Sequence, residues 1–140
     1  MSQPPKQQDK RTIDQQRAAH AMKLINARKE MGPDAYKKYP SYVDGLPASI
    51  VMSGLGQACA TLLAATRGKQ NDPHRMLYDD LNAWMCQANT YSPYANKRDL
   101  LTAITEGTQR DYVRAQAEAL AYLVWLKKFS QAFLKNPDAE

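Results

Sequence analysis

The apolar pattern of the C-terminal segment constrains the fold of this chain more than any other feature. Between Asp111 and Phe133, apolar residues recur at alternating steps of three and four. This spacing places them along one side of an α-helix of about six turns. The residues of this stripe are Tyr112, Ala115, Ala119, Tyr122, Leu126, Phe129 and Phe133.

Further apolar residues widen the stripe in the middle of the same segment. Leu120, Leu123, Val124 and Trp125 extend the apolar surface most of the way around the helix. A helix that is apolar on nearly all sides is covered by other elements in a folded protein. We therefore predict an all-α, single-domain bundle of about five to six helices packed around a long C-terminal helix.

Composition agrees with this prediction. The 140 residues suffice to bury one hydrophobic core, and the 44% hydrophobic content is ordinary for a globular domain. Val and Ile are few, whereas Ala, Leu, Gln, Lys and Arg fill the periodic segments, which favours helices over strands. We expect a helical domain at residues 11–135, between a disordered N-terminal tail at 1–10 and a C-terminal tail at 136–140.

Capping residues and helix breakers divide the domain. A capping box at residues 12–15 predicts a first helix that ends at about Met31, before Gly32-Pro33. We expect residues 34–45 to be short and broken by Pro40, and a second helix to start at Leu46-Pro47. Residues 53–56 interrupt this second helix. The later helices are predicted at 57–66, at 73–87, from 96 to about 107, and from 108 onward.

The Gly54-Leu55-Gly56 segment interrupts an apolar stretch. Residues 45–66 carry no charge and approach the length of a membrane span. The two glycines and several polar residues break the centre of the stretch, so we interpret it as a buried helical hairpin or a kinked core helix. The glycines would let backbones approach closely or turn sharply. The segment lacks the Lys-Ser/Thr pair of a phosphate-binding loop.

The sequence offers little catalytic or metal-binding chemistry. His20 and His74 have no carboxylate or thiol at a metal-ligand spacing. Asp79 and Asp80 would point about 100° apart on a helix. An enzyme that uses His74, Asp79 and Asp80 is therefore disfavoured, and we predict no catalytic residue, metal, cofactor or small-molecule substrate.

The two cysteines and the N-terminal composition indicate the cellular compartment of the protein. Cys59 and Cys86 lie far apart in apolar helical segments, which indicates buried, reduced thiols. The first ten residues lack the apolar core of a signal peptide. We expect a cytoplasmic protein that is not bound to a membrane.

The net charge of +5 arises from the N-terminal part of the chain. Residues 1–40 hold nine Lys and Arg against four Asp and Glu, whereas the other hundred residues hold ten of each. Such an excess favours an anionic partner, with nucleic acid as the first choice, or else a solubilising surface. The candidate phosphate-binding residues are Arg17, Lys23, Arg28, Lys69, Arg75, Arg114, Lys127 and Lys128.

Arg17 and Arg28 are unusual because they fall within the apolar sector of the first helix. Either their aliphatic stems are buried while the guanidinium groups reach solvent, or both residues face a partner. In a second hypothesis, a helical protein–protein scaffold or adaptor without nucleic-acid contact, these arginines and Tyr36, Tyr39 and Tyr42 would anchor an interface.

Four segments together carry a family resemblance: residues 39–47, 53–63, 77–84 and 112–129. The most specific are Gly54-Leu55-Gly56-Gln57 and the helix from Arg114 to Phe129, which ends in Trp-Leu-Lys-Lys-Phe. In their order and spacing the chain resembles the small subunit of the Cmr-type, type III-B CRISPR effector complex, from about Arg17 to Phe133. Pro40 and the first ten residues depart from this pattern.

The resemblance implies a small all-helical subunit without catalytic residues. Several copies would stack along a filament whose backbone subunits hold the crRNA, and would help to form the channel for target RNA. The partners implied are the backbone subunit, neighbouring copies of the chain, and crRNA or target RNA, while cleavage belongs to other subunits. No RNA-contacting residue transfers from the family, so the candidates rest on charge and helix geometry alone.

Overall fold

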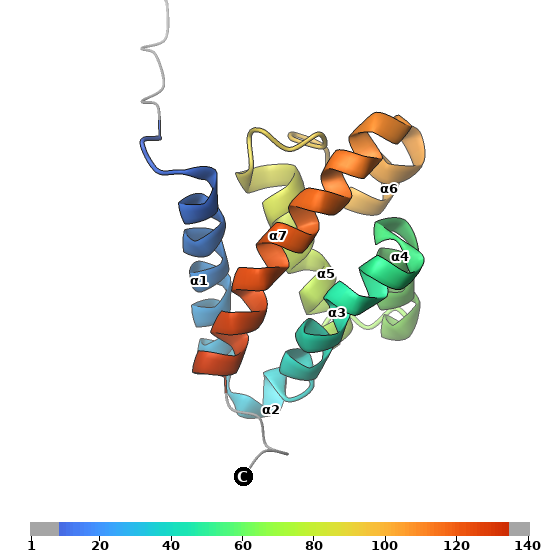
Figure 1. Ribbon diagram of the computed structural model, residues 1–140. Helices are drawn as coiled ribbons and strands as arrows, with labels where there is room; N and C mark the ends of the chain where they lie inside the picture. The colour runs from blue at the N-terminus through green and yellow to red at the C-terminus, as the bar shows by residue number, and fades with distance from the viewer. Residues whose placement is uncertain (1–8, 135–140) are drawn as a thin grey trace, which may run out of the picture.

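Residues 9–134 are described by the computed structural model, and this range is helical without a β-strand (Figure 1). The four-residue α2 is a single turn, and the π-helical segment η1 continues α5 directly. The described range therefore holds six helices longer than one turn, which confirms the predicted all-α bundle. The elements are α1 (Ile13–Met31), α2 (Pro33–Tyr36), α3 (Tyr39–Ser53), α4 (Leu55–Thr66), α5 (Pro73–Asn82), η1 (Ala83–Ala88), α6 (Leu100–Glu106) and α7 (Gln109–Phe133).

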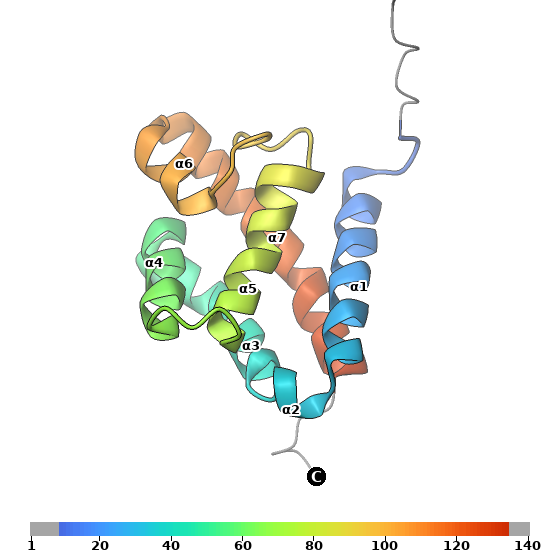
Figure 2. The same cartoon turned by 180° about the vertical axis from the view of Figure 1, so that it is seen from behind.

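The long C-terminal helix α7 crosses one side of the bundle. It packs against α1 and α3 on its two flanks, and α5 and η1 lie behind it (Figures 1 and 2). Its inner face buries Ala115, Ala119, Tyr122, Leu123, Leu126 and Ser130.

One detail of the predicted packing of α7 is wrong. Val124 is 50% exposed, although the widened apolar stripe predicted that other elements would cover this position. The reason is geometric: α1, α3 and α5 with η1 occupy three sides of α7, and no described element covers the fourth side (Figure 1).

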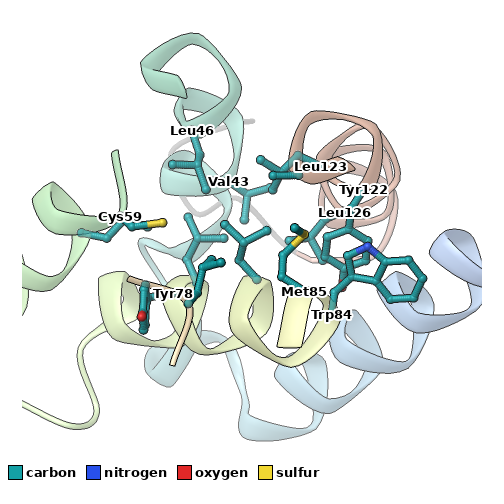
Figure 3. Packing of buried hydrophobic residues seen from close by; sticks show 14 of the residues in the cluster. Val43, Leu46, Cys59, Tyr78, Trp84, Met85, Tyr122, Leu123 and Leu126 are labelled. Atoms are coloured by element: carbon teal, nitrogen blue, oxygen red, sulfur yellow. The ribbon is translucent and has the colours of Figure 1, made fainter. Parts of the chain in front are cut away.

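The core lies where α3, α5, η1 and α7 meet (Figure 3). Val43 of α3, Met85 of η1, and Leu123 and Leu126 of α7 are fully buried there. Burial of each such aliphatic side chain stabilises the fold by about 1.5–3 kcal/mol. Cys59 and Cys86 are free and buried, as predicted.

The start of the second long helix differs from the prediction. Helix α3 begins at Tyr39 and continues through Pro47 to Ser53. Pro40 lies in the first turn, where its missing N–H group costs nothing, so it does not break the segment. Pro47 lies inside the helix, and the burial of Val43, Leu46 and Ile50 offsets its cost of about 3 kcal/mol.

The backbone of the glycine segment contacts side chains of α7. Gly54 ends α3 with a φ of 88°, and a Cβ atom at this position would lie 2.8 Å from Tyr112 Oη. The Leu55 N–H donates to Gln116 Oε1 at 3.0 Å, and the Gly56 N–H donates to Tyr112 Oη at 3.0 Å. Side chains of α7 thus satisfy the first N–H groups of α4.

The helix predicted from residue 96 begins later. Asn96 has a φ of 67°, in the left-handed region, and its N–H donates to the Cys86 carbonyl at 2.8 Å. Helix α6 starts at Leu100, because the Asp99 carboxylate accepts from the Thr102 N–H and caps it. Residues 89–99 therefore form an ordered loop between η1 and α6.

Candidate nucleic-acid interface

Arg28 pairs with a buried carboxylate of its own chain. Its Nε donates to Asp80 Oδ2 at 3.0 Å, and its Nη2 donates to the other oxygen, Oδ1. The Tyr39 hydroxyl donates to the same Oδ2 at 2.6 Å. Asp80 is only 2% exposed. Arg28 thus neutralises a carboxylate in the core. Its guanidinium group neither reaches into solvent nor faces a partner, which were the two arrangements expected from the sequence.

Arg17 makes the corresponding pair between α1 and α7. Its Nε and Nη2 donate to Glu118 Oε2 and Oε1 at 2.7 and 2.8 Å, and its Nη1 donates to Asp14 at 3.1 Å. The Trp84 indole N–H donates to Glu118 Oε2 at 3.0 Å. One carboxylate therefore joins α1, α7 and η1, and most of the Arg17 guanidinium group is engaged in this structural contact.

Behind this pair, three aromatic rings form a layer. The Trp84 and Tyr122 rings stack with centroids 5.2 Å apart (Figure 3), and the Tyr122 hydroxyl lies 2.8 Å from His20 Nδ1. Burial lowers the pKa of His20 to about 4, so its imidazole is neutral at pH 7 and shares a hydrogen bond with the Tyr122 hydroxyl through Nδ1. His20 is a packing residue of the α1–α7 contact.

The tyrosines proposed as interface anchors do not share an exposed edge. Tyr36 and Tyr39 are buried in the core. Tyr42 is half-buried and stacks on His74, with ring centroids 3.7 Å apart. The expected aromatic edge is absent because α3 begins at Tyr39, which points toward Asp80 rather than toward solvent.

The remaining candidate cations lie on the surface. Arg75 pairs with Asp79 at 3.0 Å, and Arg114 is 3.8 Å from Asp111. Within residues 9–134, the candidate lysines make no ion pair; they are Lys23, Lys69, Lys127 and Lys128.

These surface cations do not share one face. Arg114 lies near Arg17 beside the first half of α7, whereas Lys23 lies on the η1 side of α1, near Trp84 and Ala88. Lys127 and Lys128 lie in the last turns of α7. Lys69 and Arg75 lie at the α4–α5 connection, on the opposite edge from α1 (Figure 2).

The fourth, uncovered side of α7 carries cations and no acidic residue. We call this surface the outer face of α7. A helical turn of 100° per residue places Arg110, Arg114 and Lys128 on it. Glu118 points toward Arg17 of α1, and Asp111 lies beside Pro93 and Tyr94 of the loop before α6. Its residues are Arg110, Val113, Arg114, Ala117, Ala121, Val124, Lys128 and Gln131. Arg110 was not selected from the sequence, although its position relative to the buried stripe could have indicated it.

A groove of about 300 Å³ adjoins this face at the first half of α7. Arg17, Arg114 and Glu118 line it on one side, and the loop residues Tyr91 and Ser92 on the other. Tyr91 is 69% exposed. Sequence reasoning did not select Tyr91; the only signal was an aromatic residue within a polar loop.

The candidate metal and enzyme residues can be placed in the described part of the chain. No group of three or more His, Cys, Asp or Glu side chains in residues 9–134 is placed to hold a metal ion. His74 pairs with Asp72, whereas Asp79 and Asp80 pair with different arginines, so the three residues of the enzyme hypothesis are not brought together. None of the helices described here is both long and apolar enough to cross a bilayer.

Comparisons with known proteins agree with the fold. Residues 13–133 match the model of the family described as CRISPR-associated protein (Cas_Cmr5). The chain is also similar to the X-ray crystal structure of a CRISPR-associated Cmr5 family protein from Thermus thermophilus. The two share 25% sequence identity with a TM-score of 0.66, and the match covers 89% of this chain and 100% of the other. The chain therefore belongs to the Cmr5 family, the small subunits of the Cmr-type, type III-B CRISPR effector complex.

Proposed function

We propose that this chain is a non-catalytic subunit whose copies stack along the Cmr filament and bind target RNA through the outer face of α7. The backbone subunit and neighbouring copies would be its protein partners. The observation that carries the proposal is the charge of this face, which presents Arg110, Arg114 and Lys128, with Asp111 at its edge 3.8 Å from Arg114. The family match supplies the complex in which the face would act.

The mechanism is electrostatic. Arg110 and Lys128 are 18 positions apart, which corresponds to roughly 27 Å along the helix axis. Between them, Ala117 and Ala121 are small, so an RNA backbone can approach the helix closely. Cations at this spacing contact phosphates and read no sequence, so specificity comes from pairing between guide and target. Because each copy contributes few contacts, affinity depends on several copies on one strand.

The proposal retains only some of the candidate residues predicted from the sequence. Arg114 and Lys128 lie on the outer face, with Lys127 at its side, whereas Lys23 lies on the η1 side of α1. Arg28 and Arg17 are assigned to the fold, because their guanidinium groups already bind Asp80 and Glu118. The Lys69 and Arg75 group lies on the opposite edge and serves as a control surface.

A pair of charge reversals in the assembled complex tests the proposal. Arg114→Glu with Lys128→Glu is expected to weaken target RNA binding strongly while the complex still assembles, because both residues are exposed. The matched control is Lys69→Glu with Arg75→Glu. Filter binding or fluorescence anisotropy over a range of salt concentrations measures the effect. Equal RNA affinity for the two double variants would refute the outer face as the RNA site.

A protein–protein scaffold is the second candidate function, and one observation favours it. Val51 and Met52, at the end of α3, are exposed apolar residues on a surface that no described element covers. Such side chains suit a protein interface. Photocrosslinking of labelled target RNA in the purified complex separates the two functions, because a pure scaffold would give no crosslink to this chain.

A further inference from the structure

We propose that Tyr91 and Arg114 form a stacking site for one unpaired base of single-stranded RNA, in the groove between the 89–95 loop and α7. This inference rests on the proposed function and adds to it a base-contacting residue outside α7. The outer face of α7 would hold phosphates, whereas this groove would hold a base.

The first support is that Tyr91 is exposed on an ordered loop. The buried Asn89 accepts from the Tyr91 N–H through its Oδ1 at 3.0 Å, and its carbonyl accepts from the Ser92 N–H at 3.1 Å. Ser92 Oγ accepts from the Tyr94 N–H at 3.1 Å, and Tyr94 is buried. The backbone is therefore held while the phenol ring remains in solvent, so a ligand would immobilise little of the loop on binding.

The second support is the groove beside the ring. Its volume of about 300 Å³ lies between Tyr91 and the first half of α7. Ala117, which also lines it, is small and leaves the wall on the α7 side open. A planar group that enters the groove can therefore contact the Tyr91 ring and α7 at the same time.

The third support is the charge of the groove. Its one carboxylate, Glu118, is already engaged by both donors of Arg17 and by the Trp84 indole. Arg114 is 55% exposed in its side chain and meets Asp111 only at 3.8 Å. Its guanidinium group is thus available to an anion, so the groove offers one aromatic face and one available cation.

These groups favour single-stranded RNA over other anionic ligands. A base stacks on an aromatic face, and the adjoining phosphate pairs with a guanidinium group. A duplex would leave no base face open to Tyr91. The groove lacks a set of donors and acceptors arranged for one base edge, so stacking without sequence preference is expected. An acidic peptide would use Arg114 but would gain little from the phenol face.

Substitutions of Tyr91 in the assembled complex test the stacking site. Tyr91→Leu is expected to lower the affinity for single-stranded target RNA about 5- to 100-fold, the range for loss of one stacked base. Tyr91→Phe keeps the ring and is expected to restore most of the affinity. Lys69→Ala, on the control surface at the opposite edge of the bundle, is the control for a general surface effect. Circular dichroism checks that each variant is folded.

Crosslinking gives an independent measurement. Target RNA that carries 4-thiouridine is expected to crosslink to the peptide that contains Tyr91, and Tyr91→Leu should remove that adduct. Unchanged affinity and an unchanged adduct in Tyr91→Leu would overturn the stacking site. If Tyr91→Leu instead prevents assembly without RNA, the groove binds protein and the inference is also wrong. The proposed function fails separately, if Arg114→Glu with Lys128→Glu leaves RNA binding intact.

Discussion

Two regions of the molecule use arginine in opposite ways. One is the contact of α1 with its neighbouring helices, and the other is the outer face of α7. In the first region, Arg17 and Arg28 are paired with carboxylates through two donors each. In the second, Arg114 has only a distant carboxylate. An arginine that pairs with a carboxylate on the facing helix stabilises the fold. An arginine on a helix face without such a carboxylate can bind a ligand. Charge alone does not distinguish the two regions.

The largest effect is expected where the pair is most buried. Arg28→Met keeps the apolar stem but leaves the Asp80 carboxylate buried and without its cation, which should lower the free energy of unfolding by about 3–5 kcal/mol. Arg75→Met, at the exposed pair with Asp79, should cost less than about 1 kcal/mol. Urea denaturation measures both. Similar losses in the two variants would mean that burial does not separate these pairs.

The two faces of α7 can be compared at neighbouring residues. Leu123→Ala removes a fully buried side chain and is expected to cost about 2–5 kcal/mol. Val124→Ala, one residue further along, changes the outer face and should alter stability by less than about 0.5 kcal/mol. Thermal unfolding followed by circular dichroism gives the difference. A loss at Val124 comparable to that at Leu123 would show that the outer face is covered in the isolated chain.

The contact between α1 and α7 should respond to pH, whereas the outer face should not. Burial lowers the pKa of His20 to about 4, below the ordinary value of 6.5. The unfolded chain therefore binds a proton at this residue more readily than the folded chain below pH 6.5. Stability from the neutral imidazole is present above pH 6.5 and is lost as the pH falls toward 4.

The variant His20→Phe isolates this contribution, because it keeps an aromatic ring beside Trp84 and cannot titrate. Between pH 6.5 and 4, its free energy of unfolding should fall less steeply than that of the unsubstituted chain. Denaturant titrations at several pH values measure the two slopes. Parallel curves would show that His20 is not held neutral in the folded state.

Local features were predictable because they depend on neighbours in sequence. The capping box at Thr12 and Gln15 is present, and the buried stripe of α7 largely follows its spacing of three and four. Gly54 and Gly56 lie against the Tyr112 side chain of α7, rather than against a second backbone. The covered or uncovered state of Val124 was not predictable, because it depends on which sides of α7 the other helices occupy.

The candidate site was less predictable, because its contacts join distant segments. Arg28 and Asp80 are 52 residues apart, and Arg17 and Glu118 are 101 apart. No periodicity within one helix indicates such a partner, so the sequence could not separate structural arginines from available ones. The exposure of Tyr91 likewise depends on hydrogen bonds of Asn89 and on where the loop meets η1.

Lys128→Ala is expected to have the smallest effect on stability, and its effect on the salt dependence of binding is specific to RNA. Lys128 is exposed and makes no ion pair within the described residues, so Lys128→Ala should change the free energy of unfolding by less than about 0.5 kcal/mol. If its ammonium group neutralises one phosphate of a single strand, the slope of log K against log salt should become less negative by about 0.7 for each copy engaged.

Lys69→Ala is the matched control for that measurement, because Lys69 is equally unpaired in the described range but lies on the opposite edge of the bundle. Its salt slope should equal that of the unsubstituted complex. The difference in slope is more informative than the affinity. Substitution of either lysine could disturb a protein interface and lower the affinity, but this would not remove a phosphate contact. Equal slopes for both variants would place the RNA path away from the outer face of α7, even though Lys128 makes no ion pair within the described residues.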